Sequence, residues 1–381
     1  MKIQAIAAVA ALLLSSCAAG NKAAESEAIP EHGFTIMAGS YTEPGDTALR
    51  LLHFDPADSS LTVIDGTTEV PNASYMAQAT RSGMIYVVSE GDSMHSRITA
   101  LRPAGKHSMP SIACTLPVGS AAPCYVSVSP DERYVVTADY NGGTATIFGI
   151  SSTGMLTPVK QRLRFTGSGP VAGRQDTPHP HCATFTPDGR FLLVNDLGTD
   201  RINMFPVAQE DSDSLVITDQ ATQVQLPAGA GPRHIVFNAK GNIAYLINEI
   251  SDTVTVLDYN KKTLIPRQHL AADTALAHGA GDIQLSPDLR NLYASLRLKH
   301  EGIATFDVNT RTGEIRYKGH TPTAAHPRNF LITPDGLFLL VACKNDGIVQ
   351  VFSRNPASGA LTDTGHSLKI PGVVCLKTVN L

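Results

Sequence analysis

The sequence predicts an all-β fold, a seven-bladed β-propeller of four-stranded antiparallel blades. Two observations carry this prediction. A segment of about fifty residues recurs six times, and the two ends of the chain hold complementary parts of a seventh copy. The composition agrees, because only 17% of the residues are charged while Gly (31) and Pro (24) are abundant. That balance is typical of many short strands joined by turns, not of long solvated helices.

Each copy of the repeat begins at a small polar residue that is followed by a turn and an apolar run. The starting residues are separated by 49, 57, 52, 48 and 47 residues, and they are Thr80, Ser129, Thr186, Asn238, Ser286 and Thr333. Pro-Asp-Gly, which follows the start of two copies, suits a tight turn because Pro fixes φ and Gly accepts a positive φ. The recurring unit is therefore two strands joined by a turn, with further strands outside them.

The copy that starts at Ser129 shows how one unit becomes a blade. Residues 124–128 form an apolar run before the turn, and residues 134–138 form a β-rich run after it. A third run covers residues 144–148, and a fourth strand begins after the Gly-bearing turn at 153–156. Four antiparallel strands of this length make one propeller blade. Six such units cover roughly residues 71–365.

The two ends of the chain supply the remaining blade. Residues 34–41, 49–54 and 61–64 form three predicted strands without an innermost partner, and residues 372–379 form one strand without a sheet. Joining them closes the ring and removes an exposed sheet edge that would invite aggregation. An eight-bladed ring or an open solenoid fits the strand count less well.

The N-terminus has the pattern of an export signal. Met1-Lys2 is followed by an apolar run over residues 3–14, which is too short to span a bilayer as a mature helix. Leu14-Ser-Ser-Cys17 resembles a bacterial lipobox, and the alternative is an ordinary signal peptide with an incidental Cys. We expect a signal peptide over 1–16, lipidation at Cys17, a flexible tether over 17–33 and the propeller over 34–381. The predicted location is the bacterial cell envelope, facing the periplasm or at the outer membrane, with the membrane contacted only through the lipid.

Composition and missing motifs exclude several classes of protein. The net charge of −4 and the absence of a Lys/Arg-rich run argue against a nucleic-acid partner. The five cysteines after Cys17 show no Cys-x-x-Cys spacing, which favours buried thiols over a zinc site or a disulfide framework. There is no G-x-S-x-G elbow, P-loop or G-x-G-x-x-G motif. We expect no cofactor and no metal, since His179-Pro-His181 has no carboxylate cluster near it in sequence.

The repeat also predicts which side chains meet at one mouth of the central channel. One set lies five residues before each start: Tyr75, Cys124, His181, Arg233, Gly281 and Arg328. The other lies ten or eleven residues after it, at the far end of the second strand: Glu90, Tyr140, Leu197, Glu249, Arg297 and Lys344. These positions differ between copies that share a framework, which is typical of a ligand site built on a repeat. The alternative is a polar channel lined by ion pairs and water.

The chemistry of these side chains suits an anionic substrate. Arginine holds carboxylate or phosphate through two hydrogen bonds, and arginines aimed at a carbonyl oxygen stabilise a developing oxyanion. Glu249 beside Arg233 could act as a general base on water, and His181 could relay a proton. The long insertion over 167–178 is expected to cover the same face, and Arg174 is either a binding group or a solvated loop residue.

These motifs resemble the seven-bladed-propeller lactonases, a family that includes bacterial 6-phosphogluconolactonases and fungal carboxymuconate cycloisomerases. The resemblance runs from Gly39-Ser-Tyr-Thr to the C-terminus. It is carried by Arg174-Gln-Asp-Thr-Pro-His-Pro-His181, Gly231-Pro-Arg-His234, Asn248-Glu249, Ser295-Leu-Arg297 and His326-Pro-Arg-Asn-Phe330.

The resemblance implies metal-independent hydrolysis of an anionic sugar lactone, 6-phospho-D-glucono-1,5-lactone to 6-phosphogluconate. Its catalytic groups fall on four residues here: His181, Arg233, Glu249 and Arg297. We expect the substrate to be bound by four more: Arg328, Arg174, His179 and Glu90.

Two departures from the family bear on the substrate. Leu296 stands where the family tends to have Asn. The export signal leaves the lactone open, because the sugar-phosphate pathway is cytosolic. Two alternatives stay open: a cycloisomerase in which Glu249 or His181 moves a proton, and a non-catalytic envelope propeller that binds a glycan or a protein.

Overall fold

The structure is a computed structural model that describes residues 32–105, 107–208, 214–273 and 275–381. His32–Leu381 is one compact unit. The predicted signal peptide over 1–16, the lipidation site Cys17 and most of the tether over 17–33 lie outside the described residues. Within the described part of the chain, no helix is long and apolar enough to cross a membrane.

The described residues form seven four-stranded antiparallel sheets, numbered here as blades 1–7. Blades 1–3 consist of β4 (Ala73–Gln78), β5 (Ile85–Ser89), β6 (Arg97–Arg102), β7 (Ser111–Pro117); β8 (Pro123–Val128), β9 (Tyr134–Asp139), β10 (Thr144–Ile150), β11 (Leu156–Arg164); and β12 (Pro180–Phe185), β13 (Phe191–Asp196), β14 (Arg201–Pro206), β15 (Thr222–Gln225), with a 3₁₀ turn η1 (Thr218–Gln220). Blades 4–6 consist of β16 (Pro232–Phe237), β17 (Ile243–Asn248), β18 (Thr253–Tyr259), β19 (Leu264–Ala271); β20 (Ala280–Leu285), β21 (Asn291–Leu296), β22 (Gly302–Val308), β23 (Ile315–Pro322); and β24 (Pro327–Ile332), β25 (Phe338–Cys343), β26 (Ile348–Arg354), β27 (Leu361–Lys369).

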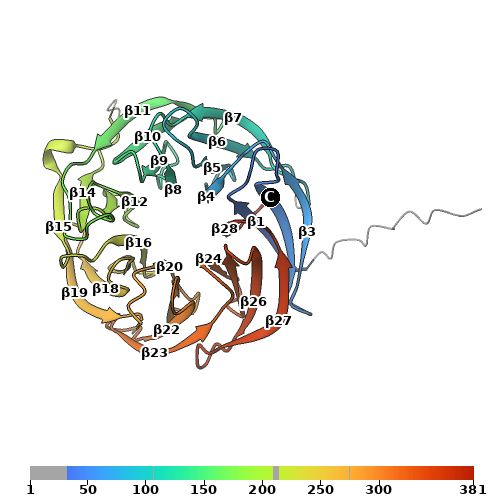
Figure 1. The fold of residues 1–381 in the computed structure, drawn as a ribbon. Coiled ribbons are helices and arrows are strands. Elements are labelled where there is room, and N and C mark those ends of the chain that lie inside the picture. The colour runs from blue at the N-terminus through green and yellow to red at the C-terminus, as the bar shows by residue number, and fades with distance from the viewer. Residues whose placement is uncertain (1–31, 106, 209–213, 274) are drawn as a thin grey trace, which may run out of the picture. The chain divides into compact units, whose positions relative to one another are not determined.

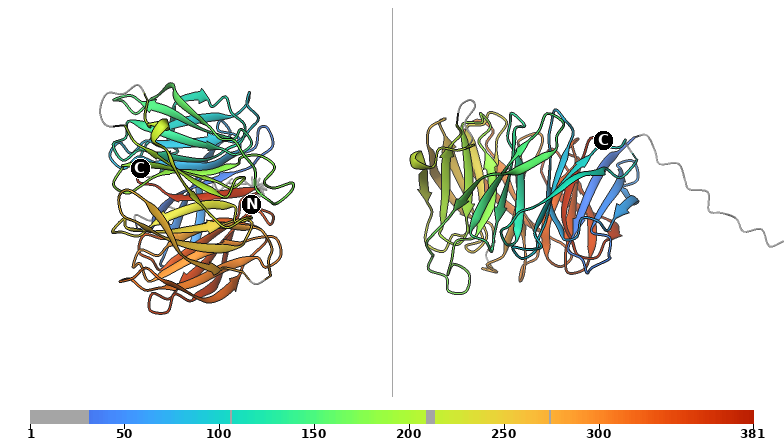
Figure 2. Two further views of the ribbon diagram at one scale, coloured as in Figure 1. Left: turned by 90° about the vertical axis from the view of Figure 1, so that its left-hand side faces the viewer. Right: turned by 90° about the horizontal axis from the view of Figure 1, so that it is seen from above.

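Blade 7 joins the two ends of the chain and confirms the predicted closure. Its order is β28 (Val373–Thr378), β1 (Phe34–Ser40), β2 (Leu49–Asp55) and β3 (Ser60–Thr67). The C-terminal strand pairs antiparallel with β1, with Ala38 opposite Leu376. Figure 1 shows this meeting of the blue and red ends, and Figure 2 shows the strands running across the thickness of the ring.

Each blade turns its first strand toward the centre of the ring (Figure 1). The innermost strands β4, β8, β12, β16, β20, β24 and β28 contact one another in a closed circle. A β-bulge interrupts the pairing of β4, β8, β12, β16, β20 and β24 near the start of each strand, for example between Pro180 and Cys182. A bulge adds one residue and re-aims side chains, so two successive residues of each innermost strand are available to line the channel.

The turn after each innermost strand explains why the repeat begins at Ser or Thr. The hydroxyl of Ser129 donates to Asp131 Oδ1 and accepts from the amide of Tyr134, and Thr186 makes the same pair of bonds with Asp188 and Phe191. The small polar residue therefore closes the turn from inside.

In blade 1 the predicted register is wrong by one residue. The amide that bonds back across the turn belongs to Ala79, which donates to the carbonyl of Met84 as Ser129 does to that of Tyr134. Alanine has no hydroxyl, so the sequence analysis placed the start of this copy at the neighbouring Thr80. The residue at the first channel position is consequently Ser74, not Tyr75, and Glu90 lies eleven residues after its start like the others.

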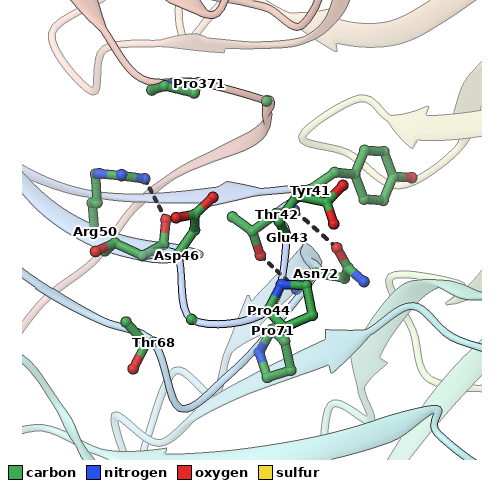
Figure 3. A pocket seen from close by; sticks show the side chains of 13 residues that line it. Tyr41, Thr42, Glu43, Pro44, Asp46, Arg50, Thr68, Pro71, Asn72 and Pro371 are labelled. Carbon is green, nitrogen blue, oxygen red and sulfur yellow. Dashed lines mark hydrogen bonds between the residues drawn. The ribbon is translucent and has the colours of Figure 1, made fainter.

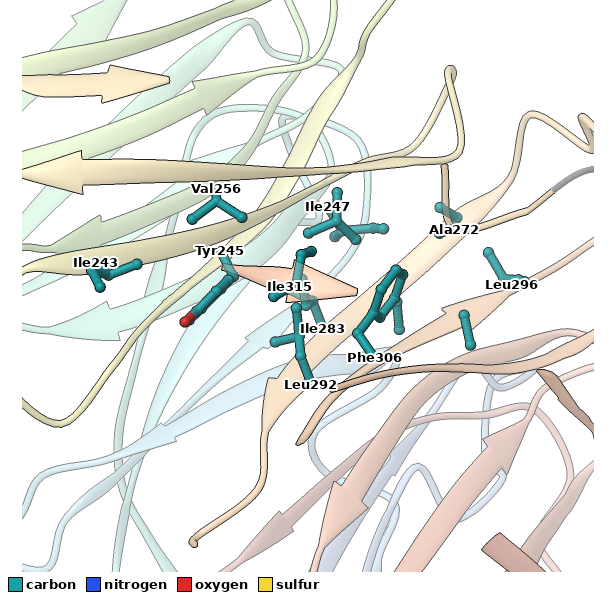
Figure 4. Packing of buried hydrophobic residues seen from close by; sticks show 14 residues of the cluster. Ile243, Tyr245, Ile247, Val256, Ala272, Ile283, Leu292, Leu296, Phe306 and Ile315 are labelled. Carbon is teal, nitrogen blue, oxygen red and sulfur yellow. The ribbon is translucent and has the colours of Figure 1, made fainter. Parts of the chain in front are cut away.

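Apolar side chains fill the space between neighbouring blades. Between blades 4 and 5 the cluster includes Ile247, Ile283, Leu292 and Phe306, all 1% exposed or less (Figure 4). A tyrosine on the second strand adds a polar tie, since the Tyr245 hydroxyl donates to the carbonyl of Gly313 at 3.1 Å. Two other interfaces repeat the tie, from Tyr86 to Gly154 and from Tyr293 to Gly359.

We expect Tyr245→Phe to lower the free energy of unfolding by about 1–2 kcal/mol, because the buried Gly313 carbonyl loses its donor. Thermal unfolding measures the effect. The control is Tyr317→Phe, since Tyr317 is 41% exposed. Equal melting temperatures for Tyr245→Phe and the wild type would show that the tie contributes nothing.

Candidate active site

Two rings of side chains surround one mouth of the channel. The first ring is the second residue of each innermost strand: Ser74, Cys124, His181, Arg233, Gly281, Arg328 and Val374. The second ring is the residue that follows each second strand: Tyr41, Glu90, Tyr140, Leu197, Glu249, Arg297 and Lys344. Six of these seven second-ring residues donate their amide to the carbonyl of the residue directly before an innermost strand, which places both rings at one face.

Glu249 is the centre of one charged cluster at this mouth. Its Oε1 accepts from Arg174 Nη2 at 2.6 Å, and its Oε2 accepts from Arg233 Nε at 2.9 Å and lies 3.1 Å from Arg297 Nη2. The two arginines on Oε2 are buried, at 2% and 5% exposure, and Arg297 is also held by the carbonyls of Gly279 and Ala280. The carboxylate is thus fixed from three sides by residues far apart in sequence.

The surrounding charges set the ionisation of this cluster. Burial raises the pKa of Glu249, but Arg297, Arg233, Arg174 and Arg328 outweigh burial and lower the pKa to about 2. His181 Nε2 lies 4.0 Å from Glu249 Oε2. Burial, followed by the charge of Arg233, holds the pKa of His181 well below its ordinary value. At neutral pH the site therefore combines an ionised Glu249 with a neutral imidazole.

A second charged cluster faces Glu249 across the mouth. The Tyr41 hydroxyl donates to Glu90 Oε1 at 2.8 Å and accepts from Arg328 Nη2 at 2.8 Å. Arg328 Nη2 lies 4.0 Å from Glu90 Oε1, and Lys344 Nζ lies 5.6 Å from the centre of the Tyr41 ring. Burial raises the pKa of Tyr41, so its hydroxyl stays protonated. Across the two clusters, five cationic side chains face two carboxylates, and the site favours an anionic ligand.

The two clusters border a cavity of about 250 Å³. It is lined by Glu90, Ala122, Cys124, Tyr140, Asn141, His181, Glu249 and Arg328. Four of the eight predicted site residues therefore line it directly. Arg174, Arg233 and Arg297 reach it through Glu249. His179 does not line the cavity: its ring stacks on Tyr140 at 4.3 Å and its Nδ1 lies 3.0 Å from the Tyr140 carbonyl, so it supports the wall from behind.

The insertion before blade 3 brings Arg174 to the site. Gln175 fixes the insertion, because its buried amide donates to the carbonyl of Leu197 and to Asp200 Oδ1. Arg174, one residue earlier, extends across the face to Glu249 and to the carbonyl of His278. The placement favours the binding interpretation of Arg174 over that of a solvated loop residue.

A larger hollow of about 1150 Å³ adjoins the site on the same face (Figure 3). The segment after β1 lines it, including Tyr41 and Thr42, and Thr42 donates its amide to Asn72 Oδ1 at 2.9 Å. Tyr41 therefore stands between the hollow and the cavity. Its hydroxyl bonds both Glu90 and Arg328, yet the sequence analysis did not assign Tyr41 to the site.

The repeat contained the signal for Tyr41. Tyr41 follows the second strand of blade 7 as Tyr140 follows that of blade 2, but blade 7 is split between the chain ends and its turn follows β28. The start residue of that blade is Val379, whose amide donates to the carbonyl of Thr35. Val379 carries no polar side chain to mark it. Tyr140 and Lys344 were in the predicted set but were not assigned to the site.

Comparison with known proteins agrees with this architecture. Residues 35–378 match the family model described as lactonase, 7-bladed beta-propeller. A 6-phosphogluconolactonase from Formosa agariphila is 29% identical over 88% of this chain and 97% of its own, and one from Bacillus subtilis is 28% identical over 89% and 96%.

Solved structures give the same result. The crystal structure of a candidate 6-phosphogluconolactonase from Bacteroides fragilis superposes with a TM-score of 0.87 at 37% identity, over 92% of this chain and 99% of that one. A periplasmic gluconolactonase from Pseudomonas aeruginosa superposes with a TM-score of 0.86 at 29% identity, over 91% and 99%. The fold and the family match over residues 35–378 lead to one conclusion: the chain belongs to the seven-bladed β-propeller lactonase family.

Proposed function

We propose that the protein is a lactonase that hydrolyses an anionic sugar lactone at the channel mouth, with 6-phospho-D-glucono-1,5-lactone as the first candidate. One observation carries the proposal: an ionised carboxylate, Glu249, is held by three arginines beside a cavity that a second cationic cluster borders. The names of the relatives support the reaction type. A cavity near the lower limit of roughly 300 Å³ for ligand pockets suits a ligand the size of one sugar.

In the proposed reaction, water attacks the lactone carbonyl carbon. Glu249 orients the water and takes its proton, an arginine stabilises the negative charge on the carbonyl oxygen, and the ring oxygen leaves. That oxygen takes a proton through His181 and becomes a hydroxyl, so the product is the open-chain aldonic acid. The acid then ionises to the aldonate.

With a pKa of about 2, the Glu249 carboxylate is a weak base in the free protein. Binding of an anionic substrate is expected to raise that pKa. An anionic group that binds Arg174 or Arg328 competes with Glu249 for their charge, which raises the pKa of Glu249 toward the range of an effective base. Binding of the anion and activation of the base are then coupled.

The test is hydrolysis by the full-length protein of 6-phosphogluconolactone and unphosphorylated gluconolactone, with and without chelator. Faster turnover of the phosphorylated lactone, unaffected by chelator, supports the proposal. Equal rates would point to a neutral lactone, and no hydrolysis of either would favour a non-catalytic propeller. We further propose a periplasm-facing envelope location, supported by the predicted export signal and by the periplasmic relative.

We expect Arg174→Met to move the acidic limb of kcat/KM to higher pH. Arg174 lowers the pKa of Glu249, so its loss raises that pKa and protonates the base at a higher pH. The measurement is kcat/KM from about pH 2 to 6, since kcat/KM reports the free enzyme, in which the pKa of Glu249 is about 2. Arg316→Met, a change on the outer strand β23, is the control, because the Arg316 side chain is 83% exposed. Superimposable profiles for Arg174→Met and the wild type would exclude this coupling.

A further inference from the structure

A third ring of side chains lies beneath the active-site mouth and contains an arrangement with no role in the proposed reaction. It consists of the third residue of each innermost strand: Tyr75, Tyr125, Cys182, His234, Asp282, Asn329 and Cys375. Six of these residues, all but Cys182, line a separate cavity of about 330 Å³ deeper in the channel. Among them, His234 and Asp282 form a buried pair with His234 Nδ1 2.8 Å from Asp282 Oδ1.

Asp282 is held as an ionised acceptor. Burial raises its pKa, but the hydrogen bond from His234 and the charge of Arg233 outweigh burial, and the pKa lies below its ordinary value. Its Oδ2 accepts from Asn329 Nδ2 at 2.6 Å and from Gln284 Nε2 at 3.2 Å. Since an ionised carboxylate only accepts hydrogen bonds, the hydrogen between the pair is on His234 Nδ1.

The guanidinium of Arg233 lies against the His234 ring. Its Nη1 is 3.1 Å from Nε2 and 3.3 Å from Nδ1, so it contacts the face of the ring and not the lone pair of one nitrogen. The same Nη1 donates to the carbonyl of Gly281 at 3.0 Å, while Arg233 Nε donates to Glu249. A chain of contacts thus runs from Asn329 in blade 6 through Asp282 in blade 5 to His234, Arg233 and Glu249 in blade 4.

We propose that the His234–Asp282 pair is a positioning device that orients Arg233 and, through it, the carboxylate of Glu249. The inference rests on the proposed function for its kinetic meaning. Arg233 is 2% exposed, so water cannot replace a partner that it loses. Burial and the charge of Arg233 lower the pKa of His234 to about 4, so the neutral ring packs against one end of the guanidinium without adding a positive charge next to it. The neutral His234 ring also adds no positive charge beside His181, whose ring centre lies 5.3 Å from that of His234.

The first test is His234→Phe, which keeps a ring but removes both nitrogens. We expect kcat to fall by about 10- to 100-fold, the range for residues that support catalytic ligands, while KM changes by less than about threefold. The matched control is Cys375→Ala, a buried residue of the same ring on blade 7, with kcat unchanged. An unchanged kcat in His234→Phe overturns the inference.

The second test distinguishes positioning through Arg233 from general loss of structure. In an Arg233→Lys background the guanidinium is absent, so His234→Phe should then lower kcat by less than about twofold. The same fold loss in both backgrounds overturns the inference. If the wild type hydrolyses no lactone, the proposed function fails and the positioning is tested by crystallography: His234→Phe with the 2.9 Å contact between Arg233 Nε and Glu249 Oε2 retained would overturn it, and a displaced guanidinium would support it.

Discussion

Replacing Glu249 by Gln is expected to lower kcat by roughly 10²- to 10⁴-fold, the contribution of a positioned general base. The amide keeps the size of the side chain, and its single oxygen can still accept from Arg174 or from Arg233. It cannot take a proton from water. The measurement is steady-state hydrolysis of 6-phosphogluconolactone, together with calorimetric binding of 6-phosphogluconate.

Binding of the anionic product should be retained or tightened by Glu249→Gln, because the substitution removes a negative charge from a site with five nearby cations. Loss of both turnover and binding would instead indicate a collapsed site. Glu132→Gln is the control, since Glu132 lies in the turn after β8 at the opposite face and should leave kcat unchanged. Wild-type turnover in Glu249→Gln would reject the assignment of this residue as the base.

The sequence was sufficient for the ring and for the face on which the charged residues gather. The spacing from Ser129 to Tyr140 and from Asn238 to Glu249 is set by one turn and one strand, so equivalent positions in different blades had to share a face. This argument failed only where a blade lacked its polar start. Ala79 shifted the register in blade 1, and the split blade 7 hid Tyr41.

The pairing inside the site could not be predicted in the same way. The repeat brings Glu249 and Arg297 to the same mouth, but it does not say that Arg297, Arg233 and Arg174 share one carboxylate. That outcome depends on side-chain reach, on the bulge that re-aims Arg233 and on an insertion, fixed by Gln175, that belongs to no repeat. The low pKa of Glu249 is a consequence of that geometry and was accordingly not accessible from residue types.

The lower ring illustrates the same limit. His234 was part of the Gly231-Pro-Arg-His234 motif, yet its neighbour Arg233 alone was assigned a role, since an alternating strand would place the two side chains on opposite faces. The bulge in β16 allows both to face the channel. No residue type in this segment predicts the bulge.

The second large effect is expected at Arg328, on the far side of the mouth from Glu249. Arg328→Met should raise KM for 6-phosphogluconolactone by about 10- to 100-fold, because a charge-assisted hydrogen bond to an anion contributes about 1.5–3 kcal/mol. The loss should appear in KM more than in kcat, since Arg328 holds Tyr41 and lies near Glu90 but does not bond to Glu249. Steady-state kinetics on the phosphorylated and unphosphorylated lactones measure both constants.

The comparison between the two lactones decides what Arg328 binds. If the arginine holds the phosphate, KM for unphosphorylated gluconolactone stays nearly constant while KM for the phosphorylated substrate rises. If it instead stabilises the carbonyl oxygen, kcat falls for both substrates alike, because the oxyanion develops in either case. Met keeps much of the apolar stem of arginine, so packing against the Tyr41 ring, 5.3 Å from the guanidinium carbon, is largely preserved. Unchanged kcat and KM on both lactones would show that Arg328 has no part in the site. The argument that an anion is held at this side of the channel would then fail.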